Sequence, residues 1–186
     1  MKKIIYLEIC VIVVTYLIGS LSVPKNFIPL FSICWQLAVI LYLFLIKKIH
    51  PNFNLMLTVV LLAGFFAISW FGLGNHNVSS IIRSIILAPL MEEMLFREYI
   101  FNNLTGKSGR KIFLSSVIFG AYHIKNILLF SPLYILRQIF SAIVLGLING
   151  YLKARTRSLT MPIAIHSFNN GVFASLQKIA FKFLFS

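Results

Sequence analysis

The feature that most constrains the fold of this chain is a series of seven long apolar stretches, separated by short polar or basic segments. A helix that spans a membrane needs about 20 mostly apolar residues, and a soluble core of this size has no need of such stretches. They cover residues 4–23, 27–46, 55–73, 79–103, 111–124, 133–152 and 159–183. We therefore predict an all-α fold, a polytopic transmembrane helical bundle with about seven membrane helices. The chain would form a single integral-membrane domain over residues 1–186.

Seventeen basic residues against four acidic ones give the chain a net charge of +13. A nucleic-acid-binding protein would gather its basic residues on one soluble surface, whereas here they form short clusters between the apolar stretches, so we exclude nucleic acid as a partner. If the N-terminus is cytoplasmic, most of the clusters fall on the cytoplasmic side, as the positive-inside rule requires. Those loops contain Lys2, Lys3, Lys47, Lys48, Lys107, Arg110, Lys111, Lys153, Arg155 and Arg157. The opposite loops contain Lys25 and Lys125, with Arg83 and Arg137 near outer helix ends.

We thus predict an integral membrane protein with a cytoplasmic N-terminus. The composition, rich in Ile, Lys, Phe and Asn, is typical of a bacterial protein, so we expect the bacterial cell membrane as its location. The lipid bilayer is then an obligatory partner.

Three of the four acidic residues lie within eight positions, in the segment MEEMLFRE at residues 91–98. Ionisable groups inside membrane helices cost free energy, and for that reason they usually mark a functional site. Polar residues of this kind occur in three predicted helices: Glu92, Glu93 and Arg97 in the fourth, His123 in the fifth, and His166 with Asn170 in the seventh.

The predicted depth of these residues in the membrane is similar in all three helices. Glu92, His123 and His166 lie roughly 12–18 Å from the cytoplasmic side at 1.5 Å per helical residue. A single membrane histidine more often makes an interhelical hydrogen bond than takes part in catalysis. Unrelated structural residues would have no reason to share one level, so we interpret the three together as a site.

Spacing within the helices divides the polar residues into two groups. Glu93 and Arg97 are four residues apart and can pair on one helix face, whereas Glu92 is rotated by about 100° from Glu93. His166 and Asn170 are also four residues apart and can face one point. The structural alternatives are a bracing role for the Glu93–Arg97 pair and interhelical hydrogen bonding for Asn170. We predict one carboxylate held by an arginine and one available for chemistry.

Three short motifs resemble those of a known family. EEMLFR reads as EExxxR, FGAYH as FxxxH and HSFNN as HxxxN, in this order within residues 92–170. Together they resemble the CaaX-protease and bacteriocin-processing (Abi) family of intramembrane endopeptidases. The motif-bearing core would occupy about residues 79–183.

The resemblance implies a role for each motif residue. Glu92 would be the general base that activates water, with His123 beside it. His166 and Asn170 would stabilise the oxyanion at the scissile carbonyl. The remaining three residues, Glu93, Arg97 and Phe119, would support the site.

Cofactor and substrate are less constrained by the resemblance. We expect no required cofactor, and the zinc-protease motif HExxH is absent, but one glutamate and two histidines could bind zinc, so a divalent metal stays an open alternative. The substrate would be a peptide or protein in or at the membrane, in maturation of a bacteriocin or pheromone or in self-immunity. A non-catalytic bacteriocin-immunity or regulatory binding protein is the alternative. A small transporter with buried charges is less favoured, because matching broken helices are missing from the two halves.

Overall fold

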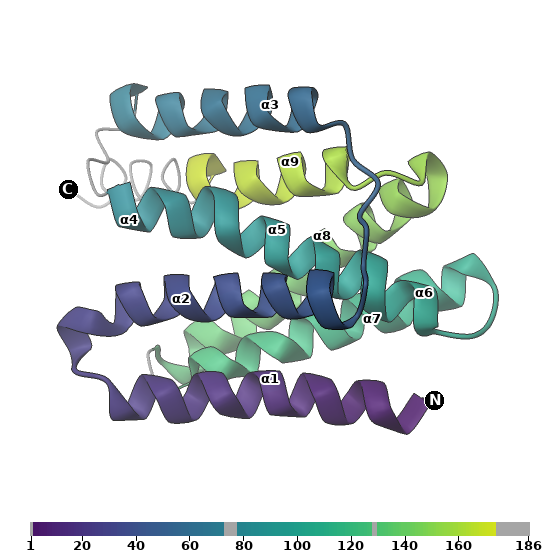
Figure 1. The fold of residues 1–186 in the computed structure, drawn as a ribbon, viewed down its shortest axis with the longest axis horizontal. Coiled ribbons are helices and arrows are strands. Elements are labelled where there is room, and N and C mark those ends of the chain that lie inside the picture. Colours follow the sequence, from purple (N-terminus) through teal and green to yellow (C-terminus); the bar gives the residue numbers. More distant parts are fainter. Residues whose placement is uncertain (1, 73–77, 128–129, 174–186) are drawn as a thin grey trace.

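The structure is a computed structural model that describes residues 2–72, 78–127 and 130–173, and within these ranges every regular element is helical (Figure 1). The first half contains α1 (Lys2–Ser22), η1 (Lys25–Phe27), α2 (Ile28–Leu41), η2 (Tyr42–Ile46), α3 (Leu55–Ala67) and η3 (Ile68–Gly72). A long run follows, made of α4 (Val78–Ile81), η4 (Ile82–Leu87), α5 (Ala88–Glu93), η5 (Met94–Ile100) and α6 (Phe101–Asn103). The last elements are α7 (Ser108–Tyr122), η6 (His123–Asn126), α8 (Pro132–Thr156), α9 (Thr160–Phe168) and η7 (Asn169–Phe173).

These elements join end to end into helical runs that match the predicted apolar stretches, which confirms the all-α fold. Residue 73 of the third stretch and residues 174–183 of the last lie outside the described residues. Within the described part, the runs Lys25–Ile46 and Pro132–Thr156 are long and apolar enough to cross a membrane, while Tyr6–Ser22 and Leu55–Trp70 are apolar but shorter. The seven membrane helices and the single domain therefore stay predictions.

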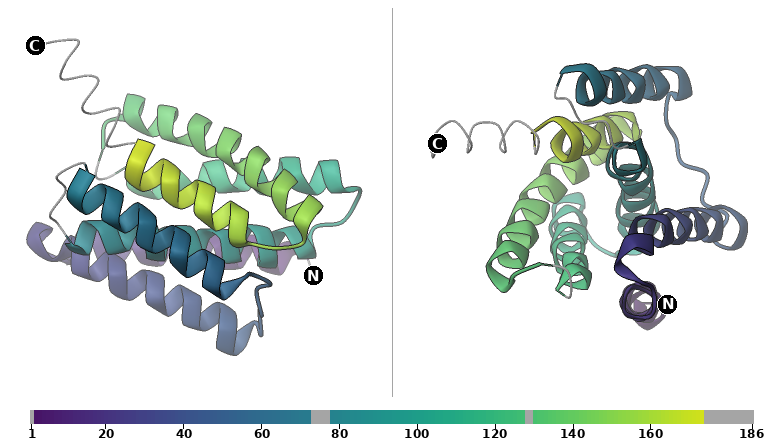
Figure 2. Two further views of the ribbon diagram at one scale, coloured as in Figure 1. Left: turned by 90° about the horizontal axis from the view of Figure 1, so that it is seen from above. Right: turned by 90° about the vertical axis from the view of Figure 1, so that its left-hand side faces the viewer.

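The run from α4 to α6 is the central helix of the bundle. Residues 91–101 are all buried, since α5 packs against α2 and α9, and η5 packs against α7 and α8 (Figure 2). The acidic segment thus lies at the centre of the molecule, surrounded by other helices. Burial of charged groups in such a position requires partners for each of them.

Pro89 explains why this central helix departs from regular α-helical geometry. A proline inside a helix cannot donate its backbone hydrogen bond, and its ring collides with the preceding turn. Immediately before it, the Ala88 amide donates to the carbonyl of Arg83, a bond that spans five residues and makes η4 a π-helix. The wider turn accommodates the proline without breaking the helix.

Glycine residues bring α7 and α8 close together. A Cβ atom on Gly146 would lie 2.9 Å from the Cβ of Ser116, and one on Gly150 would lie 3.1 Å from a methyl carbon of Ile112. Small residues at a helix crossing allow the two backbones to approach, which is the usual packing of helices in membranes. This close pair supplies one wall of the site.

A polar network fastens α1 to the central helix. Glu8 accepts a hydrogen bond from Lys47 at 2.5 Å and another from the Tyr99 hydroxyl. Lys47, which is predicted to lie in a cytoplasmic loop, pairs with Glu8 of α1. The contact holds the N-terminal helices against η5, and those helices cover one side of the site.

Candidate active site

A cavity of about 780 Å³ opens among α2, α5, α7, α8 and α9. Its lining includes Glu92, Phe119, His123, His166 and Asn170, so the structure brings together residues from all three motifs. Glu93 and Arg97 are fully buried behind the cavity wall. Glu92 thus borders the cavity and Glu93 lies behind its wall beside Arg97, while the chemical role of each carboxylate stays a prediction.

Glu92 has a side-chain nitrogen atom near each of its two carboxylate oxygens. The Nε2 atom of His166 lies 3.6 Å from Oε2, and the ammonium of Lys125 lies 3.3 Å from Oε1. The Glu92 side chain is 6% exposed, and that exposed part faces the cavity. The carboxylate is therefore oriented by its neighbours while still open to a molecule in the cavity.

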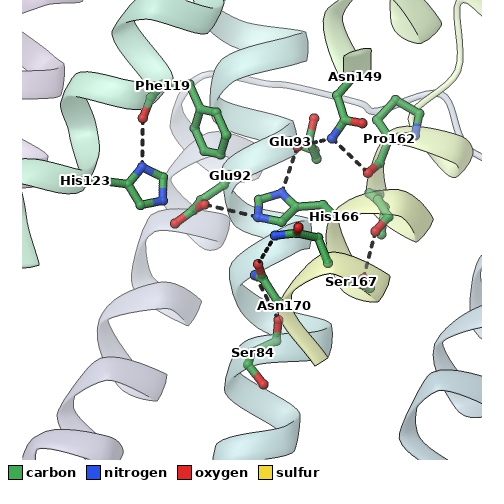
Figure 3. A network of polar contacts seen from close by, with 12 residues as sticks. Ser84, Glu92, Glu93, Phe119, His123, Asn149, Pro162, His166, Ser167 and Asn170 are labelled. Carbon is green, nitrogen blue, oxygen red and sulfur yellow. Dashed lines mark hydrogen bonds and ion pairs between the residues drawn. The ribbon is translucent and has the colours of Figure 1, made fainter. Parts of the chain in front are cut away.

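Glu93 is the most completely enclosed of the acidic residues. Its Oε1 accepts hydrogen bonds from His166 Nδ1 at 2.8 Å and from Asn149 Nδ2 at 2.9 Å. Its Oε2 lies 3.2 Å from Arg97 Nε, and because neither of these two atoms makes a hydrogen bond, the contact is an ion pair. His166 thus bridges the two glutamates, with one ring nitrogen toward each (Figure 3).

His123 stands at the point where α7 tightens into the 3₁₀ turn of η6. Its Nδ1 donates to the carbonyl of Phe119 at 2.9 Å, so its other nitrogen, Nε2, is left to act on the cavity side (Figure 3). The Phe119 ring meets the rings of His123 and His166 edge-on, at 5.0 and 5.6 Å between centroids, and lies 5.1 Å from the Arg97 guanidinium. Phe119 is therefore the packing centre of the site.

Asn170 lies one turn beyond His166, in the π-helical η7. Its Nδ2 donates to the carbonyl of Ser84 at 3.2 Å, which ties η7 to the central helix (Figure 3). Its amide oxygen lies 3.4 Å from the side-chain nitrogen of Asn169. Asn170 borders the same cavity as His166, and a shared role at an oxyanion stays a prediction.

Sequence reasoning missed two residues of the site, Lys125 and Asn149. Lys125 was assigned to a loop, but its side chain is 8% exposed and pairs with Glu92. Asn149 is fully buried in α8 and connects Glu93 to the carbonyl of Pro162, at 2.9 and 3.1 Å. Asn149 could have been found from the sequence, because it is an amide side chain inside an apolar helix. The only sequence signal for Lys125 was its position two residues after His123.

The sequence leaves a divalent metal as an open alternative for the side chains that the structure describes. Among them, no group of three or more His, Cys, Asp or Glu residues is arranged to hold a metal ion. The cation nearest to Glu92 Oε1 is the ammonium of Lys125. A metal ion bound at Oε1 of Glu92 would compete with that ammonium.

Comparison with known proteins gives a family-model match that covers this site, and a match to a curated relative. Residues 74–172 match the family model described as type II CAAX prenyl endopeptidase Rce1-like. A Bacillus subtilis (strain 168) protein described as a candidate membrane peptidase, YdiL, is 33% identical over 101 residues, which are 52% of this chain and 36% of the relative. The alignment thus spans about a third of that relative's length. No solved structure matches.

Proposed function

The chain belongs to the Rce1-like family of type II CAAX prenyl endopeptidases, and on this premise we propose that it is an intramembrane endopeptidase. The observation that carries the proposal is the position of Glu92, whose carboxylate borders a cavity between His123 and His166. Peptide hydrolysis needs a base for water, a donor for the leaving amine and stabilisation of an oxyanion. We assign the proton transfers to Glu92, with His123 beside it, and stabilisation of the oxyanion to His166 and Asn170.

In the proposed reaction, a water molecule binds between Glu92 and His123. Glu92 accepts its proton as the hydroxide attacks the scissile carbonyl carbon, and the carbonyl oxygen becomes an oxyanion. The proton then passes to the amine nitrogen as the carbon–nitrogen bond breaks. Donors that are already fixed in a site of low dielectric stabilise such developing charge strongly.

The oxyanion would lie beside His166 and Asn170, as the motif resemblance implies. His166 is held by Glu93, so its ring cannot rotate freely, and Glu93 is itself held by Arg97 and Asn149. A catalytic group with its orientation fixed in advance loses little entropy when the reaction begins. This support is the proposed role of the buried Glu93–Arg97 pair.

The substrate we propose is an apolar peptide or protein segment at the membrane. A cavity of about 780 Å³ is large enough for several side chains. Maturation of a bacteriocin or pheromone precursor, or self-immunity, would use such cleavage. The alternative of a non-catalytic immunity or regulatory protein is favoured by one contact, because Glu92 is already engaged in an ion pair with Lys125.

Glu92→Gln tests the proposal directly. The amide keeps the size of the side chain but cannot accept the proton, so we expect cleavage to fall about 10²–10⁴-fold. The assay uses protein in liposomes with a library of quenched fluorogenic peptides that includes farnesylated CAAX peptides, with rates normalised to folded protein by size-exclusion chromatography. Glu8→Gln is the matched control, because it makes the same chemical change outside the cavity lining.

Two outcomes would contradict the proposal. Cleavage by Glu92→Gln at the wild-type rate would remove Glu92 as the base. If wild type cleaves nothing and Glu92→Gln still protects cells against a bacteriocin, the non-catalytic alternative is correct.

A further inference from the structure

The ammonium of Lys125 lies among three aromatic rings. It is 3.4 Å from the ring centroid of Tyr122 and 5.5 Å from those of Tyr16 and Trp35. An ammonium within about 6 Å of an aromatic face is attracted to it, more strongly when water is excluded. The rings therefore compensate part of the cost of burying this charge, and they determine where it lies.

Two of the three rings come from the N-terminal helices. Tyr16 lies in α1 and Trp35 in α2, and both precede residues 74–172, the part of the chain that matches the family model. These helices carry none of the three motifs. Through the rings they nevertheless reach the cation that contacts Glu92.

Lys125 and His166 engage different oxygens of Glu92, Oε1 and Oε2 respectively. Rotation of the Glu92 carboxylate about its terminal bond would break the 3.3 Å hydrogen bond from the Lys125 ammonium to Oε1. The nearby ammonium also favours the ionised form, which is the form that a general base requires. Other titratable groups around this point include His123, Tyr16, Tyr122 and Arg97, and Arg83 and Arg137 line the same cavity.

A second buried pair in the chain provides the comparison. Lys153 contacts Glu98, and both side chains are as little exposed as those of Lys125 and Glu92. Lys125 and Glu92 border the cavity, whereas Lys153 and Glu98 are absent from its lining. A bound molecule in the cavity can therefore contact the Lys125–Glu92 pair, whereas a purely structural pair does not require such access.

We propose that Lys125 is a positioning residue of the peptidase, which orients Glu92 and keeps it ionised, and that Tyr16 and Trp35 make the N-terminal helices part of this arrangement. The proposal rests on the proposed function. It predicts that a substitution of Lys125 alters catalysis although Lys125 belongs to none of the three motifs.

Lys125→Met tests the role in catalysis, because methionine retains an unbranched chain and removes the charge. We expect kcat to fall about 10²-fold, the loss that a small misplacement of a catalytic group produces. The acid limb of the kcat/KM profile should move to higher pH, because no neighbouring ammonium then opposes protonation of Glu92. Lys125→Arg should restore part of kcat, and Lys153→Met is the control that should leave the pH profile unchanged.

A second measurement tests the pair without any cleavage. Wild type and Glu92→Gln are treated with acetic anhydride, and acetylation of Lys125 and Lys153 is measured by mass spectrometry. We expect Lys125 to react several-fold faster in Glu92→Gln, because it has lost its counter-ion, with Lys153 as an unchanged internal control. An unchanged Lys125 rate would overturn the pairing.

The two measurements separate the possible failures. Wild-type cleavage together with an unaltered kcat and pH profile in Lys125→Met would overturn the positioning role and leave the peptidase function intact. Absence of any wild-type cleavage, with acetylation that still responds to Glu92→Gln, would overturn the peptidase function and with it the positioning role, while the ion pair would stand.

Discussion

Replacing Arg97 by methionine isolates the support behind the site. Arg97 is fully buried, and its Nε lies 3.2 Å from Glu93 Oε2. Two unit charges at that distance interact by about 5 kcal/mol at an effective dielectric constant of about 20. Removing one partner of a buried pair typically costs about 3–5 kcal/mol, because the other charge stays buried. We expect Arg97→Met to lose stability in this range, with Glu93 retaining only His166 and Asn149.

The double variant Glu93→Gln/Arg97→Met gives the result that distinguishes the pair from two independent contacts. It leaves neither charge unpaired, and the glutamine oxygen can still accept hydrogen bonds from His166 and Asn149. Its loss of stability should therefore be at least about 2 kcal/mol smaller than the sum of the single losses.

The assay is unfolding in mixed micelles of mild detergent and sodium dodecyl sulfate, followed by circular dichroism. Each variant is compared with wild type at the same micelle composition, and folded yield is measured by size-exclusion chromatography. Additive losses in the double variant would refute the reasoning, since they would mean that Glu93 and Arg97 do not interact. An Arg97→Met variant of wild-type stability would refute the estimate itself.

Three further predictions follow from other parts of the molecule. Gly146→Ala should cost about 1–3 kcal/mol in the same unfolding assay, because its new methyl would meet Ser116, whereas Gly109→Ala, with open space around it, should not destabilise; equal effects would exclude close α7–α8 packing. A cysteine at Lys107, with both native cysteines replaced by serine, should react with an impermeant maleimide only in permeabilised cells; labelling of intact cells would reverse the predicted orientation. Cleavage should survive EDTA, because an ammonium already lies 3.3 Å from Glu92; loss with EDTA and recovery with zinc would show a required metal.

Hydrophobic patterning was sufficient to locate the helices, because apolar length is the property that the bilayer selects. Hydrophobic patterning could not predict the π-helical turns, since a wide turn changes the register of a helix without changing its composition. Pro89 was the local signal for one of them, as its ring cannot fit a regular turn. The central position of the fourth run was also not predicted, because burial by protein and burial by lipid both require apolar residues.

The shared depth of Glu92, His123 and His166 is visible from sequence because rise along a helix is nearly constant. Their common cavity agrees with that reasoning. The contact of Lys125 could not be read in the same way. In a regular α-helix, Lys125 would be rotated by about 200° from His123 and would face away from it, while the 3₁₀ turn brings the rotation to about 240°. Its aromatic neighbours come from helices far away in the chain.

The pairing of acidic side chains has a consequence for the lipids around the protein. Each carboxylate contacts a different basic side chain: Glu8 with Lys47, Glu92 with Lys125, Glu93 with Arg97, and Glu98 with Lys153. The net charge of +13 therefore has no counter-charge within the chain. Anionic phospholipid headgroups can supply it, at about 1 kcal/mol for each basic residue near the membrane surface. The protein should accordingly gather a shell of anionic lipid, which a neutral detergent would remove.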